Sequence, residues 1–124
     1  MARARIDSGI GATAVRGALA GGDVSRDTLA TAVRFLLQVL AERAEGNTVE
    51  VRVPPFGAVQ AIEGPRHTRG TPPNVVEMNA ATWLALATGR EQWLDALADG
   101  RVAASGQRAD LREVLPVIAA RIEP

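Results

Sequence analysis

Three potential cations stand within four positions of a stretch that is rich in Pro and Gly. Arg66, His67 and Arg69 belong to residues 64–73, Gly-Pro-Arg-His-Thr-Arg-Gly-Thr-Pro-Pro. Because Pro fixes φ and Gly accepts unusual angles, this stretch predicts a constrained loop. Arg presents forked donors that suit phosphate or carboxylate, so the loop is a candidate site for an anionic head group. The alternative is that these Arg side chains bond loop carbonyls and a nearby Glu.

The residue inventory excludes most familiar catalytic centres. The 124 residues contain no Cys, no Lys and no Tyr, and His67 is the single His. A thiol nucleophile, a Schiff-base amine and a cysteine or multi-His metal site are therefore excluded, and we expect neither a metal nor another cofactor. Acid–base catalysis by Asp, Glu or His67 stays open, and Glu63 or Glu77 buried beside His67 in a pocket would favour it.

Charge and hydropathy narrow the class of protein. Fourteen Arg balance fourteen Asp plus Glu, whereas a domain that holds a nucleic-acid backbone normally has a basic excess, so no nucleic-acid partner is expected. No run approaches the roughly 18–20 apolar residues of a membrane span, and residues 1–5 precede no apolar segment of a secretion signal. The sequence predicts one cytoplasmic domain over residues 1–124, with residues 1–24 as an N-terminal extension and short helix and residues 25–118 as its core.

Two helical patterns occupy the N-terminal part. Residues 9–14 match the dinucleotide fingerprint G-x-G-x-x-A, but no strand precedes them, so they predict a plain helix start. Residues 13–20 predict a short Ala-rich helix. Ser25 is a good N-cap for a long helix to about residue 44, whose polar residues form one narrow stripe. That helix either packs on a sheet and on the first helix, or its inner face also lines an apolar cavity.

Strand patterns follow the long helix. Residues 48–53 alternate between Val and polar side chains, which is typical of a half-buried strand, and residues 58–63 predict its antiparallel partner. Residues 74–106 then read strand, helix, helix, strand, with Asn79 as the N-cap of a helix that carries Trp83 and with Trp93 on the next helix. A last helix is expected from the spacing of Leu111, Val114, Leu115, Ile118 and Ile122, with a kink at Pro116.

This order of elements resembles the sterol carrier protein type 2 family. The specific match is Asn-Ala-Ala-Thr-Trp-Leu-Ala-Leu-Ala-Thr-Gly at residues 79–89, followed by Ala-Leu-Ala-Asp-Gly-Arg-Val at residues 96–102 and Ser105-Gly106. Residues 53–60, Val-Pro-Pro-Phe-Gly-Ala-Val-Gln, and the loop of residues 63–74 look like the small stand-alone actinobacterial branch of that family, the bacterial sterol carrier orthologues. The resemblance covers roughly residues 29–118.

The resemblance implies an α+β fold and a function. The fold would be a twisted, mainly antiparallel sheet of four to five strands with about five helices on one side, and the sequence itself shows four strands. The function would be non-covalent binding and transfer of a lipid (fatty acyl, phospholipid or sterol-like), with transient contact to a membrane surface and no catalytic residue. The apolar pocket would be lined by Leu36, Leu37, Leu40, Val51, Val53, Trp83, Leu86, Trp93, Leu97 and Leu115. A protein-interaction module or homodimer with a filled cavity is the alternative, and the oligomeric state stays open.

Overall fold

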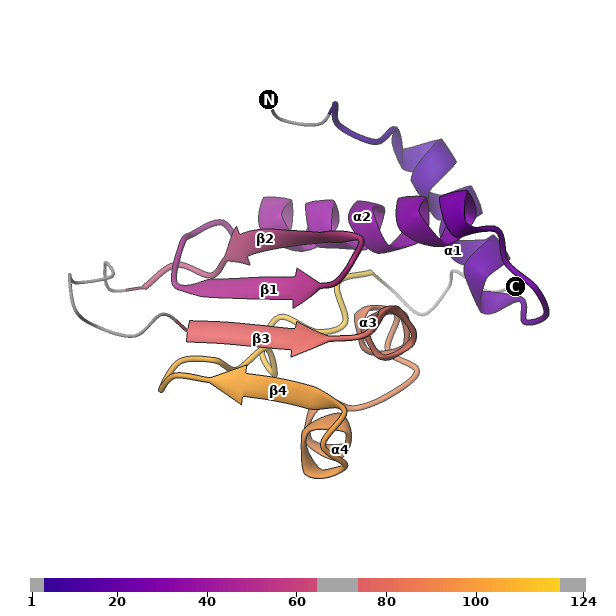
Figure 1. Ribbon diagram of the computed structural model, residues 1–124. Helices are drawn as coiled ribbons and strands as arrows, with labels where there is room; N and C mark the ends of the chain where they lie inside the picture. Colours follow the sequence, from indigo (N-terminus) through magenta and orange to yellow (C-terminus); the bar gives the residue numbers. More distant parts are fainter. Residues whose placement is uncertain (1–3, 65–73, 119–124) are drawn as a thin grey trace.

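The computed structural model describes residues 4–64 and 74–118. Those residues form four helices and four strands, so the helix count is four in the described part of the chain where about five were expected. The elements are α1 (Ser8–Leu19), α2 (Arg26–Arg43), β1 (Val49–Val53), β2 (Gly57–Ala61), β3 (Asn74–Met78), α3 (Ala80–Ala87), α4 (Trp93–Ala98) and β4 (Val102–Ser105) (Figure 1).

The strands form one mixed sheet in the order β2-β1-β3-β4. β1 pairs with β2 and β3 pairs with β4 in antiparallel fashion, and β1 and β3 run parallel at the centre. β3 runs parallel to β1 because β2, which comes between them in the chain, runs in the opposite direction to both. The predicted α+β class and mainly antiparallel sheet are confirmed.

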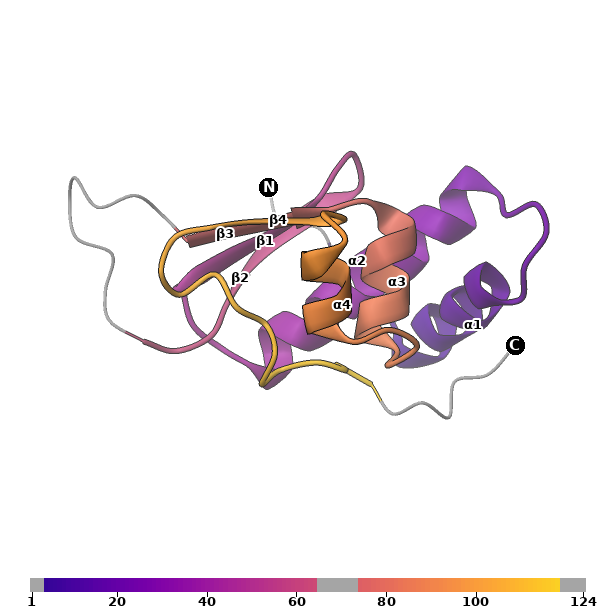
Figure 2. The same ribbon diagram turned by 90° about the horizontal axis from the view of Figure 1, so that it is seen from below.

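The helices lie on one side of the sheet, which Figure 2 shows close to edge-on. α2 packs against β2, α1 and α3, and α4 packs against β4. The alternation along β1 explains this layering, because Val49, Val51 and Val53 are buried under the helices whereas Arg52 is exposed on the opposite face. The hydrophobic core therefore fills the space between the sheet and α2, α3 and α4.

Side-chain caps set where the helices begin. Ser25 accepts a hydrogen bond from the backbone N–H of Thr28 and Asn79 accepts one from Thr82, as the sequence predicted. α1 begins at Ser8, five residues before the predicted start, because the Asp7 carboxylate accepts the N–H groups of two residues of the first turn. Residues 9–14 thus lie inside a helix, in agreement with the interpretation of that motif as a plain helix start.

The predicted last helix does not form over residues 111–118. This part, the C-terminal segment, makes one turn in which the N–H groups of Val114 and Leu115 donate to Leu111 O, and it then leaves helical geometry at Pro116. Pro116 has no N–H to continue the helix. The N–H groups of Val117 and Ile118 both donate to Ala87 O at the end of α3 instead, at 2.9 and 3.3 Å. The remaining predicted helix position, Ile122, lies outside the described residues.

Candidate functional site

Eight of the ten predicted pocket residues are buried in the core of the protein. Leu97 and Leu115 differ from the rest, because Leu97 on α4 is 37% exposed and Leu115 in the C-terminal segment is half-buried. The eight buried side chains come from α2, β1, α3 and α4, so the predicted residues do converge between the helices and the sheet. They are Leu36, Leu37, Leu40, Val51, Val53, Trp83, Leu86 and Trp93.

Trp83 joins α3 to the long helix. Its side chain is fully buried, and its indole Nε1–H donates to the carbonyl oxygen of Val33 on α2 at 3.3 Å. The ring thus has an apolar body in the core and one polar group that is satisfied by a helix carbonyl. This arrangement is that of a structural side chain that fixes the distance between two helices.

A hollow of about 350 Å³ opens at the edge of this core and is called the α3–α4 hollow below. It lies between the end of α3, the beginning of α4 and the C-terminal segment, and its volume falls in the range of small-molecule sites. Three predicted pocket residues, Leu86, Trp93 and Leu115, are brought together there. The other lining residues are Gly89, Glu91, Gln92, Leu94, Asp95, Arg112 and Pro116.

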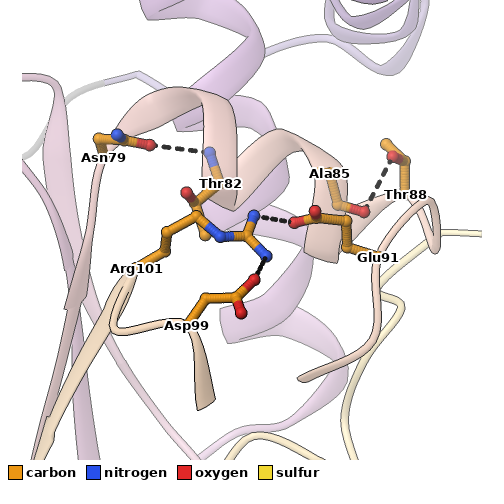
Figure 3. A network of polar contacts seen from close by, with 7 residues as sticks. All are labelled: Asn79, Thr82, Ala85, Thr88, Glu91, Asp99 and Arg101. Carbon is orange, nitrogen blue, oxygen red and sulfur yellow. Dashed lines mark hydrogen bonds and ion pairs between the residues drawn. The ribbon is translucent and has the colours of Figure 1, made fainter. Parts of the chain in front are cut away.

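Ion pairs hold the polar rim of the α3–α4 hollow. Arg101 donates hydrogen bonds to two carboxylates, that of Glu91 on the rim and that of Asp99, the second at 3.0 Å (Figure 3). The bond to Glu91 connects the loop after α3 to the residue that precedes β4. Arg112 bonds Asp110 at 2.8 Å, and the hydrogen bond from the backbone N–H of Arg112 lowers the pKa of the Asp110 carboxyl. Both cations are thus matched by carboxylates, and Asp95 adds a further carboxylate to the lining of the hollow.

The C-terminal segment forms one wall of the α3–α4 hollow and is fastened to two helices. Besides the two bonds from residues 117 and 118 to Ala87 O, Arg43 at the end of α2 donates through Nη1 to Val117 O at 2.6 Å. Thr88 caps α3 by donating its hydroxyl to Leu84 O at 2.6 Å, and it makes a longer contact of 3.5 Å with Ala85 O, which Figure 3 draws. The wall is therefore held by three hydrogen bonds to α2 and α3, at a point next to Leu115 and Pro116.

A second hollow, of about 790 Å³, was not predicted from the sequence. It lies between the residues before α1, the outer side of α2 and the turn from β1 to β2. The signal for it was the polar stripe of the long helix, since Thr31, Arg34 and Gln38 of that stripe line the hollow. Its other lining residues are Ala4, Ile6, Leu37, Pro55, Phe56, Gly57, Ala58 and Val59.

The candidate polar sites of the sequence have different outcomes. Arg66, His67 and Arg69 lie outside the described residues. Glu63 and Glu77 are both exposed, so the burial that would favour acid–base catalysis is not seen at either carboxylate. Within residues 4–64 and 74–118, no three His, Cys, Asp or Glu side chains gather to hold a metal ion. No helix in that same part of the chain has the length and apolar content to cross a bilayer.

Comparison with known proteins identifies the family. A family model described as bacterial SCP ortholog matches residues 25–117, which span α2 to the C-terminal segment and include every lining residue of the α3–α4 hollow. No curated protein matches the chain. The family match suggests a lipid-binding or carrier role. It covers most of the chain and agrees with the resemblance carried by residues 79–89, so the protein belongs to the bacterial SCP ortholog family.

Proposed function

We propose that this protein binds a lipid or a similar apolar small molecule without changing it chemically, and that it carries the molecule in the cytoplasm between membrane surfaces. Family membership supports the carrier role in general terms. The single observation that carries the proposal is the α3–α4 hollow, where Leu86, Trp93 and Leu115 present apolar surface at the edge of a packed core. Burial of apolar ligand surface stabilises a complex by about 25 cal/mol per Å², so such a site needs no catalytic group.

The proposed site extends from the hollow toward the core. The predicted pocket residues on α2 and β1, such as Leu36 and Val51, are fully buried, and they would contact a long ligand only after side chains move. Among the walls of the hollow, we propose that the C-terminal segment moves, because it is neither helix nor strand, and its movement would break the three hydrogen bonds that fasten residues 117–118 to α2 and α3. A short apolar group would fit in the hollow as it stands, and a longer chain would displace this segment.

Filling the α3–α4 hollow is expected to weaken ligand binding without loss of stability. Gln92 lines the hollow, is exposed and makes no side-chain capping bond for α4, so Gln92→Phe should leave the free energy of unfolding within about 0.5 kcal/mol of the parent. The added ring occupies the hollow, and the apparent Kd of an acyl probe should rise at least about tenfold, which corresponds to about 1.4 kcal/mol. Displacement of an uncharged fluorescent acyl probe measures this change.

Gln60→Phe is the matched control, because Gln60 is exposed on β2 and lines neither hollow. The control should bind the probe as the parent does. Equal affinities of the parent and Gln92→Phe would show that acyl chains bind elsewhere and would remove the α3–α4 hollow from the proposal.

We propose that the basic side chains of residues 66–69 contact the head group of the lipid. Replacement of Arg66, His67 and Arg69 by Ala together should weaken binding of anionic lipids and leave that of neutral lipids unchanged, since only anions gain from charge-assisted hydrogen bonds. Vesicles with and without an anionic phospholipid provide the comparison. If the variant and the parent discriminate equally between the two vesicles, these residues do not contact the head group.

A homodimer or interaction module is the second candidate, because Leu94 and Leu97 on α4 are 53% and 37% exposed. Native mass spectrometry of protein purified without detergent separates the two functions in one measurement. A retained fatty acid, phospholipid or sterol supports the carrier and gives the ligand class. A ligand-free mass that doubles with concentration supports the module.

A further inference from the structure

The hollow beside the outer face of α2 is a built site with one charged residue, and it is called the Arg34 hollow below. β2 lies next to α2 at this edge of the sheet (Figure 1). Ile6, Leu37, Phe56 and Val59 supply apolar walls from the N-terminal residues, α2 and the turn and strand of β2. Among the described lining residues, Arg34 is the only one that carries a charge. The Arg34 hollow shares no lining residue with the α3–α4 hollow.

The N-terminal wall of the Arg34 hollow is fixed to α2 by paired contacts. The Gln38 side chain accepts from Ile6 N at 2.8 Å and donates to Ile6 O at 2.9 Å, as a neighbouring strand would. One turn further along α2, Glu42 accepts two hydrogen bonds from the Arg5 guanidinium, at 2.7 and 3.0 Å. These contacts hold residues 5–6 alongside α2 and keep the hollow open between them and the turn after β1.

Arg34 has donors left over for a ligand. Its Nε–H donates to Phe56 O at 2.7 Å, which fixes the orientation of the guanidinium in the lining of the hollow. Within the described residues, neither Nη atom of Arg34 has a hydrogen-bond or ion-pair partner. The side chain is half-buried, and a guanidinium in apolar surroundings binds carboxylates through two parallel hydrogen bonds.

A second guanidinium adds to the positive field without lining the hollow. Arg26 stacks on the Phe56 ring, 5.4 Å from its centroid. Two carboxylates of α2 stand near the hollow without lining it: Glu42 is paired with Arg5, and Asp27, next to Arg26 in the chain, is exposed to solvent. The charge of the Arg34 hollow is thus positive and suits a single negative charge, whereas its walls suit an alkyl chain.

We propose that the Arg34 hollow binds a monocarboxylate with an apolar tail, with the carboxylate on the Nη donors of Arg34 and the tail against the half-buried Ile6 and Val59. This site goes beyond the proposed function, because it is separate from the α3–α4 hollow and selects the ligand by its charge. Its volume of about 790 Å³ has room for a medium-length alkyl chain. A neutral analogue of equal length loses the charge-assisted bonds, so the site predicts a preference for the acid of about tenfold or more.

Calorimetric titration with decanoate and with decanol tests the site. Arg34→Gln removes the charge but keeps an amide donor for Phe56 O, and Arg16→Gln is the control on α1, where an exposed Arg lines neither hollow. We expect Arg34→Gln to raise the Kd of decanoate about tenfold to a hundredfold and that of decanol less than twofold. The control should match the parent for both ligands.

Comparison with Gln92→Phe separates this proposal from the proposed function. If Gln92→Phe leaves the Kd of decanoate unchanged and Arg34→Gln raises it, the Arg34 hollow is supported, whether or not the α3–α4 hollow also binds a ligand. Decanoate binding that falls in Gln92→Phe and survives Arg34→Gln overturns it, as does a parent protein that binds no decanoate.

A measurement on the unaltered protein covers the case in which Arg34→Gln does not fold. The ¹⁵N signal of the Arg34 Nε–H group, assigned through its absence in Arg34→Lys, should shift on titration with decanoate and not with decanol. An Arg34 signal that stays in place at saturating decanoate overturns the proposal.

Discussion

Replacement of Trp83 by Ala is expected to lower the free energy of unfolding by about 3–5 kcal/mol. Trp83 is fully buried, so truncation removes the transfer free energy of a large ring and leaves a cavity between α3 and α2. The change also leaves Val33 O without its indole donor. Because small domains are stable by only about 5–15 kcal/mol, the variant should be partly unfolded in mild denaturant. Urea titration followed by far-ultraviolet circular dichroism measures the loss.

Trp83→Phe is the matched control for this prediction. It keeps an aromatic ring in the core but removes the donor to Val33 O, and a single lost hydrogen bond of a buried group costs about 1–3 kcal/mol. The Phe variant also leaves Trp93 as the single Trp, which reports on the α3–α4 hollow that it lines. A loss below about 1 kcal/mol in Trp83→Ala would contradict the central position of this ring in the core.

The elements that the sequence predicted correctly are those with local signals. Ser25 and Asn79 begin their helices because each side chain accepts an N–H group three residues ahead, which depends on nothing far away. The alternation of Val49, Val51 and Val53 requires only that one face of β1 be buried. The burial of Trp83 follows from the same logic, since α3 has few polar residues to expose.

The C-terminal segment shows why apolar residues at helical spacing can still predict a helix that does not form. Leu111, Val114 and Leu115 have helical spacing, but one turn forms and the chain then bonds Ala87 O. Pro116 removes the N–H that would continue the helix, and the end of α3 offers a carbonyl acceptor more than twenty-five positions earlier in the chain. A pattern within one window of sequence carries no information about that acceptor.

The two hollows were harder to predict than the core that separates them. Burial of Leu36 or Val51 follows from hydrophobic pattern, but a hollow exists only where distant segments meet imperfectly. The Arg34 hollow depends on the pairing of Ile6 with Gln38, 32 positions apart, which no spacing rule indicates. The polar stripe of α2 predicted correctly that Arg34 does not belong to the buried face of the helix. The stripe did not indicate which segment of the chain lies beside Arg34.

The second large effect is expected at Gly46, in the turn between α2 and β1. Gly46 has a φ of 147°, which L side chains rarely adopt, and an added Cβ would lie 2.1 Å from Ile62 O and 2.4 Å from Glu63 N. Two hydrogen bonds restrain the backbone at this position. Ile62 O accepts from Thr48 N at 3.1 Å, and Ile62 N donates to Ala44 O at 2.6 Å. Gly46→Ala therefore combines a strained φ with a backbone clash, and we expect a loss of about 3 kcal/mol or more in the free energy of unfolding.

Gly21→Ala separates these two causes, because Gly21 also has a positive φ of 86° but nothing within 4 Å of an added Cβ. Strain alone should cost about 1–2 kcal/mol there, and the excess in Gly46→Ala measures the clash with residues 62–63. Equal losses in the two variants would mean that the end of β2 moves aside freely. Such freedom would also loosen the edge strand that supports Val59 and the Arg34 hollow, so decanoate binding in Gly46→Ala reports whether the turn after α2 and the ligand site move together.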